Sequence, residues 1–172
     1  TISMDQKVTY ESRDANAWSF VFTLVWLGAC AGSMWYLARI GVDFYMTSWE
    51  FVLLALAVFR LIRLSTYDTI AQFLRDWFMD TKWEYDDATK LYRVTRTKPI
   101  KGLRRELYEL FACPWCIGVW LSLGLVFAFF AYPPTLYLVL ILAVAGLASI
   151  VQILSNLIGW YAEGRKIEVK NK

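Results

Sequence analysis

The chain has 172 residues, of which 58% are hydrophobic and 17% aromatic, and its formal net charge is +3. Because a soluble domain is usually about 45–50% apolar, this composition favours a membrane protein whose surface is largely solvated by lipid. The absence of histidine excludes a Ser-His or Cys-His nucleophile pair and the commonest metal ligand, and three cysteines are too few for a disulfide framework.

Four apolar segments predict transmembrane helices, and no Gly/Ser/Pro-rich linker separates them. They lie at about residues 17–38, 48–65, 115–132 and 135–161. The first and the last are long enough to cross roughly 30 Å of hydrocarbon at 1.5 Å per residue, and the second would span about 27 Å. We therefore expect an all-α membrane protein with four transmembrane helices in a single membrane domain over residues 1–172.

Small residues spaced four apart mark predicted helix-packing faces on two of these segments. Gly28 and Gly32 form a G-x-x-x-G pattern in the first segment, and Gly118 and Ser122 form a similar pair in the third. Such spacing lets two helix backbones approach closely. The alternative is that these residues have no packing role, because glycine is frequent in membrane helices.

The second segment is interrupted by charge. Thr47 and Glu50 have the spacing of a capping box at its start. Arg60 and Arg63 follow its apolar run, and Asp68 comes closely enough after Arg63 to pair with it across the next bend. One interpretation is anchoring of the helix end with a structural ion pair. The other is a basic pocket for an anionic lipid headgroup.

Residues 66–112 are predicted to form an insertion on the cytoplasmic side. Apolar residues recur at helical spacing over 70–78, which indicates an amphipathic helix lying in the membrane interface or packed on a partner. Alternating polarity over 82–85 and 91–97 is typical of a β-hairpin outside the membrane. A second apolar stripe over 103–111 indicates another short amphipathic helix.

Cys113 and Cys116 open the third segment as Cys-Pro-Trp-Cys. A thiolate at a helix N-terminus is stabilised by the helix dipole, which lowers its pKa. Three interpretations remain open: packing of two small side chains, zinc binding, and thiol–disulfide redox chemistry. Zinc needs four ligands, so two would have to come from a second subunit or another protein, and otherwise no cofactor is expected. A stable disulfide is not expected in a reducing cytoplasm.

Gln152, Ser155 and Asn156 give the fourth segment a polar face toward its predicted cytoplasmic end. Polar side chains within a membrane usually hydrogen-bond a neighbouring helix, and a pore lining is the alternative. None of the segments carries the buried acid–base chain expected of a proton-coupled transporter.

Basic residues lie almost entirely on one side of the apolar segments. Of the 18 Lys and Arg residues, Arg39 alone falls between the first and second segments, and none falls between the third and fourth. The positive-inside rule therefore predicts that the N-terminus, the insertion and the C-terminus face the cytoplasm.

Two strings of residues, taken together, resemble a known family. They are Phe59-Arg60-Leu61-Ile62-Arg63-Leu64 followed by Tyr67-Asp68-Thr69, and Cys113-Pro114-Trp115-Cys116-Ile117-Gly118-Val119-Trp120. The combination resembles an uncharacterised family of small integral membrane proteins from bacterial and phage genomes, some of which are labelled sporulation proteins. The resemblance covers about residues 48–161 and implies a three-span core, to which the first segment is an addition. It implies no established activity.

Together these features predict a non-enzymatic component of the bacterial cytoplasmic (inner) membrane that acts as a homo-oligomeric or partner-binding scaffold. Its expected partners are the lipid bilayer and either a second copy of the chain or another membrane protein, with no nucleic acid. A phage-type holin or small channel is one alternative. A thiol-redox or metal-binding membrane protein that uses Cys113 and Cys116 is the other.

Overall fold

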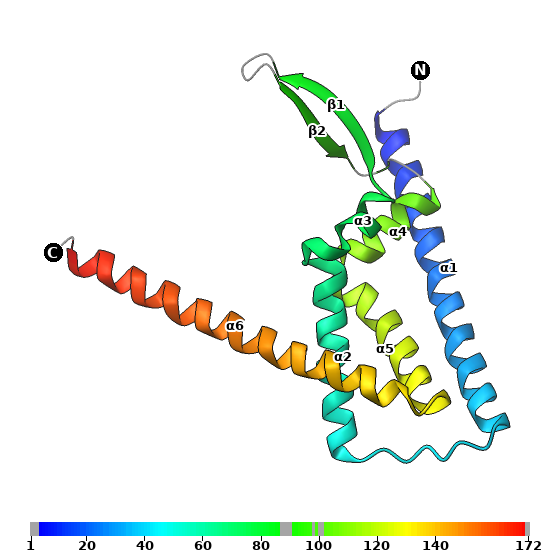
Figure 1. The fold of residues 1–172 in the computed structure, drawn as a ribbon. Helices are drawn as coiled ribbons and strands as arrows, with labels where there is room; N and C mark the ends of the chain where they lie inside the picture. The colour runs from blue at the N-terminus through cyan, green and yellow to red at the C-terminus, as the bar shows by residue number, and fades with distance from the viewer. Residues whose placement is uncertain (1–3, 87–90, 98, 100–101, 171–172) are drawn as a thin grey trace.

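The computed structural model describes residues 4–86, 91–97, 99 and 102–170. Its elements in chain order are α1 (Met4–Arg39), α2 (Ser48–Thr66), the 3-10 turn η1 (Thr69–Ala71), α3 (Gln72–Asp76), β1 (Asp80–Asp86), β2 (Leu91–Thr97), α4 (Leu103–Ala112), α5 (Pro114–Ala131) and α6 (Thr135–Lys170). α5 contacts both α1 and α2. α6 crosses α2 obliquely, and its C-terminal part extends away from the other helices (Figure 1).

Three helices in the described part of the chain are long and apolar enough to cross a membrane. The qualifying stretches are Ala17–Arg39 in α1, Pro114–Ala131 in α5 and Thr135–Arg165 in α6. This finding corrects the expected count of four transmembrane helices to three. α2 has 19 residues but carries Glu50, Arg60 and Arg63. Because three charged side chains within 19 residues make the helix less favourable to insert into lipid, α2 does not qualify by composition with the other three.

The hydrophobic core forms where α2 meets α5 and α6. Its buried side chains are Leu53, Leu54 and Ala57 of α2, Leu125 of α5, and Val139 and Ala143 of α6. Two glycines permit close approach to α2. A Cβ atom on Gly118 would lie 3.0 Å from Ile62 Cδ1, and one on Gly146 would collide with the carbonyl oxygen of Leu56. α2 is therefore at the centre of the packing, although it is charged.

The start of α2 is fixed by the capping box that the sequence predicts. Thr47 Oγ1 accepts a hydrogen bond from the Glu50 N–H at 3.3 Å, and Glu50 Oε2 accepts one from the Thr47 N–H at 2.8 Å. Both residues lie within one turn of the helix, so this motif depends only on local spacing.

One face of α1 packs on α5 through aromatic side chains. The rings of Phe22 and Trp120 meet edge to face with their centroids 6.4 Å apart. Trp26 Nε1 donates a hydrogen bond to the Val119 carbonyl oxygen at 3.4 Å, and Leu37 is buried further along the same face. Large side chains therefore make the contact between these two helices.

Short elements gather at the end of the helices where α1 begins (Figure 1). β1 and β2 pair as antiparallel strands with Asp80 opposite Thr97, and residues 87–90 between them lie outside the described part of the chain. Arg104 of α4 donates to Asp80 Oδ1 at 2.8 Å, and Arg75 of α3 donates to the Asp68 carbonyl oxygen at 3.1 Å. These bonds hold α3 at the bend that follows α2 and α4 at the start of β1. α5 begins directly after α4.

Candidate functional sites

Cys113 lies where α4 ends and α5 begins. Its extended backbone (φ −99°, ψ 109°) makes it the N-cap residue of α5, and Pro114 follows at the first helical position. Cys113 Sγ accepts hydrogen bonds from the Cys116 N–H at 3.3 Å and from the Cys116 S–H at 2.7 Å. Because both donors favour a negative charge on this sulfur, the pKa of Cys113 is lowered, chiefly by the Cys116 thiol.

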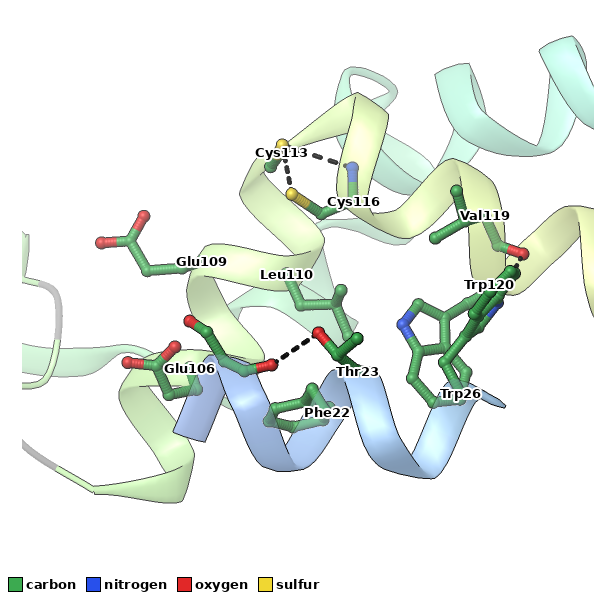
Figure 2. A pocket seen from close by; sticks show the side chains of 11 residues that line it. Phe22, Thr23, Trp26, Glu106, Glu109, Leu110, Cys113, Cys116, Val119 and Trp120 are labelled. Carbon is green, nitrogen blue, oxygen red and sulfur yellow. Dashed lines mark hydrogen bonds between the residues drawn. The ribbon is translucent and has the colours of Figure 1, made fainter. Parts of the chain in front are cut away.

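Both thiols open onto a pocket of about 520 Å³ between α1, α4 and α5 (Figure 2). Phe22, Trp26 and Trp120 give it an aromatic lining. Glu106 and Glu109 also line it, and Figure 2 shows their carboxylates directed away from the two sulfurs. Across the described residues, no group of three or more Cys, Asp, Glu or His side chains is arranged to hold a metal ion. A zinc ion at this pair would therefore need further ligands from outside the described residues.

Arg60 is held between two partners at the end of α2. Its Nη1 lies 2.9 Å from Asp68 Oδ2 and donates to Ser149 Oγ of α6 at 3.2 Å. The expected pairing of Asp68 with Arg63 is therefore wrong. The chain bends after α2 so that the Asp68 carboxylate reaches back to Arg60, and consequently it makes no capping bond at η1.

Arg63 has no carboxylate partner among the residues that the structure describes. Its guanidinium carbon lies 5.4 Å from the centre of the Tyr67 ring, a cation–π contact. Its Nε atom is buried and has no hydrogen-bond acceptor in the described chain. A buried donor without an acceptor costs about 1–3 kcal/mol. Because no carboxylate of the described residues pairs with Arg63, the charge of its guanidinium is available to an anionic partner.

A cavity of about 420 Å³ lies between α2 and α6, and we call it the Arg63 cavity. Arg60 and Arg63 line it from α2, and Ser149, Gln152 and Asn156 line it from α6. Gln152 Nε2 donates to Asn156 Oδ1 at 3.0 Å. The structure thus joins the arginines to the polar face of the fourth segment, although Ser155 is not among the lining residues. Sequence reasoning missed the contribution of Ser149, which becomes visible only when α6 crosses α2.

Small residues of the predicted packing faces lie in two different surroundings. Gly118 is buried against α2, and Ser122 Oγ donates to its carbonyl oxygen at 2.7 Å within α5. Gly28 and Gly32 are exposed, and a Cβ atom on either would meet nothing within 4 Å. The G-x-x-x-G pair of α1 therefore makes no close contact inside the described chain.

Comparison with known proteins identifies the family. Residues 53–155 match the family described as "Protein of unknown function (DUF1360)". The chain belongs to the DUF1360 family. The match contains the two arginine positions of α2 and both cysteines of the pocket, and so confirms the family resemblance indicated by these strings.

A relative of this DUF1360 protein is "Sporulation protein YjcA" from Bacillus subtilis (strain 168). The two chains are 41% identical over 104 residues, which cover 60% of this chain and 87% of the relative. No solved structure matches the chain. The family match leaves α1 outside its limits, whereas α2 lies within it from Leu53 onward and the hairpin, α4 and α5 lie wholly within it.

Proposed function

We propose that this DUF1360 protein is a non-enzymatic membrane component that assembles with a second copy of itself through the free face of α1. The observation that carries the proposal is the exposed pair Gly28 and Gly32. In a membrane-spanning helix, such a pair forms a shallow groove into which another backbone fits.

α1 has two clearly different faces. Helical geometry, at 3.6 residues per turn, sets Phe22, Trp26 and Leu37 on the side that meets α5. The opposite side carries Gly28 and Gly32, together with exposed Leu24, Ala31 and Trp35. The packing inside the chain thus uses the large side chains of α1 and leaves its small residues available for a contact between chains.

A second copy is the occupant that this face fits best. Two identical G-x-x-x-G grooves are self-complementary, because each admits the backbone of the other across a two-fold axis. Leu24 and Trp35 flank the groove and are 51% and 63% exposed, so they can pack around the crossing point. The free face therefore has small residues at its centre and larger apolar side chains around them.

The proposed location is the bacterial cytoplasmic membrane, with the hairpin and α4, where basic residues are most frequent, toward the cytoplasm. The distribution of Lys and Arg along the chain supports this orientation. Ile70, Phe73 and Trp77 near the end of α2 are 71%, 68% and 74% exposed, which suits side chains that enter the membrane interface.

The size of the particle in mild detergent tests the assembly. Gly28→Leu and Gly32→Leu should each shift the protein from dimer toward monomer, because a leucine fills the groove. Gly124→Leu is the matched control, since Gly124 is also exposed on a transmembrane helix and a Cβ there meets nothing within 4 Å. A monomeric wild type, equal dissociation by the control, or a stoichiometric second protein in the complex would each contradict association with a second copy.

Thiol chemistry at Cys113 and Cys116 is a second candidate function. The 2.7 Å separation of the two sulfurs favours it over simple packing, because both atoms are directed toward one another. A zinc ion shared between two chains would need a different contact between copies, because Cys113 and Cys116 lie on the α5 side of α1 and not on its free face. Thiol titration and a zinc assay on one purified sample separate these alternatives. A holin or channel would need polar residues along a whole span, whereas Gln152, Ser155 and Asn156 occupy a single turn of α6.

A further inference from the structure

We infer that the Arg63 cavity binds the phosphate of an anionic lipid headgroup. The site lies between α2 and α6 and is separate from the α1 face proposed for assembly. Its lining combines two guanidinium groups with hydroxyl and amide side chains, which are suitable donors for phosphate oxygens.

Charge in the cavity comes mainly from Arg63. Arg60 is already paired with Asp68 at 2.9 Å and bonded to Ser149 at 3.2 Å. Arg63 has only the Tyr67 ring beside it in the described chain, and its buried Nε has no acceptor. The cavity therefore holds one cation whose charge no carboxylate of the described residues balances. An anion bound at this guanidinium would balance that charge.

Amide groups on α6 complete the donor set. One N–H of Gln152 Nε2 donates a hydrogen bond to Asn156 Oδ1, which leaves the second N–H available. The two N–H groups of Asn156 Nδ2 take part in no hydrogen bond with the described residues. Arg63, Gln152 and Asn156 can thus present donors from two helices to one phosphate group.

Apolar surroundings favour a lipid over free phosphate. Ala145, Ala148 and Ile153 line the same cavity, which is far larger than a phosphate ion needs. The adjoining surface of α6 exposes apolar side chains, among them Val144 (69%) and Val151 (58%). A headgroup at Arg63 would leave its acyl chains along this apolar helix, whereas inorganic phosphate has nothing to place there.

Native mass spectrometry of the full chain, stripped of lipid in a maltoside detergent, tests the proposal. We expect phosphatidylglycerol to bind at one molecule per chain. Phosphatidylcholine, which has the phosphate without net charge, and inorganic phosphate, which lacks acyl chains, should each bind about tenfold more weakly.

Arg63→Gln should weaken phosphatidylglycerol binding about tenfold, and Asn156→Ala should weaken it about threefold. Arg165→Gln is the matched control, because it removes one positive charge from an exposed position on α6 that does not line the cavity. Asn156 is also exposed, so its variant remains informative if the Arg63 variant does not fold.

Equal binding of phosphatidylglycerol and phosphatidylcholine would overturn the inference. So would equal affinities of the Asn156 variant, the Arg165 control and the wild type. Inorganic phosphate binding as tightly as phosphatidylglycerol would overturn the lipid assignment. Particle size measured on the same samples separates these results from any failure of assembly through α1.

Discussion

Replacing Gly146 with alanine should destabilise the crossing of α6 over α2. A Cβ atom at this position would collide with the Leu56 carbonyl oxygen and lie 3.4 Å from Arg60 Cβ. The main obstacle is backbone, which cannot move aside as a flexible side chain can. Overpacking of this kind typically costs about 1–3 kcal/mol.

Helix propensity works in the opposite direction and must be separated from the collision. Alanine is favoured over glycine in a helix interior by about 0.8–1 kcal/mol, so Gly146→Ala alone gives a net change of about 0–2 kcal/mol. Gly159→Ala on the same helix gains the propensity without the collision, because a Cβ there meets nothing within 4 Å. The difference between the two variants therefore isolates the collision at about 1–3 kcal/mol.

Unfolding of both variants by denaturing detergent, followed by circular dichroism, measures this difference. We expect Gly159→Ala to be at least as stable as the wild type and Gly146→Ala to be clearly less stable than Gly159→Ala. If Gly146→Ala matched or exceeded Gly159→Ala, α6 would not cross α2 as closely as the structure has it.

Three further predictions concern the two ends of α2 and the cysteine pair. Cys113 should react with iodoacetamide at a lower pH than an ordinary thiol, because its lowered pKa leaves it as thiolate where other thiols are still protonated. Cys116→Ala removes the thiol donor and should move that pH profile upward, and an unchanged profile would contradict the hydrogen-bond account. Asp68→Asn should lower stability by about 1 kcal/mol, since the pair with Arg60 is only partly buried. It should also strengthen binding of anionic lipid by freeing that guanidinium, and unchanged lipid affinity would argue against the cavity. Thr47→Ala should cost about 1 kcal/mol in the same unfolding assay, and no loss would show that the capping box is dispensable.

Local patterns were readable from the sequence because their parts lie within a few residues of one another. Thr47 and Glu50 are three residues apart, and so are Cys113 and Cys116. In both cases the helix itself brings the partners together. The positions of the three apolar helices were predictable for a similar reason, because length and hydropathy are properties of continuous segments.

Contacts between helices could not be predicted from the sequence, because glycine spacing alone does not show which helix face meets a neighbouring helix. Gly28 and Gly32 have the clearest pattern in the chain, yet they meet nothing within 4 Å. Gly146 belongs to no such predicted pair, and yet a Cβ atom there would collide with the backbone of α2. Burial depends on where each helix is placed by the rest of the fold, and that information is not local.

The Arg63 cavity shows the same limit for a site. Arg63 and Asn156 are far apart in sequence, and their proximity depends on the angle at which α6 crosses α2. The error in pairing Asp68 has a related cause. Asp68 is closer in sequence to Arg63, which favoured Arg63 as its predicted partner. The chain bends after α2 in a direction that brings the Asp68 carboxylate to Arg60 instead.

Charge in α2 accounts both for the correction to the span count and for the proposed lipid site. Because α2 has three charged side chains, its composition does not match that of an apolar transmembrane helix. Each of these charges needs a partner if the helix is to lie at the core of the fold. Glu50 is engaged at the capping box, and Arg60 is engaged by Asp68 and Ser149. Among the described residues, Arg63 contacts the Tyr67 ring, lines the cavity and has no carboxylate partner. Because the described chain provides polar or charged partners for the other two charges, Arg63 is the place where the surrounding membrane can supply the missing partner.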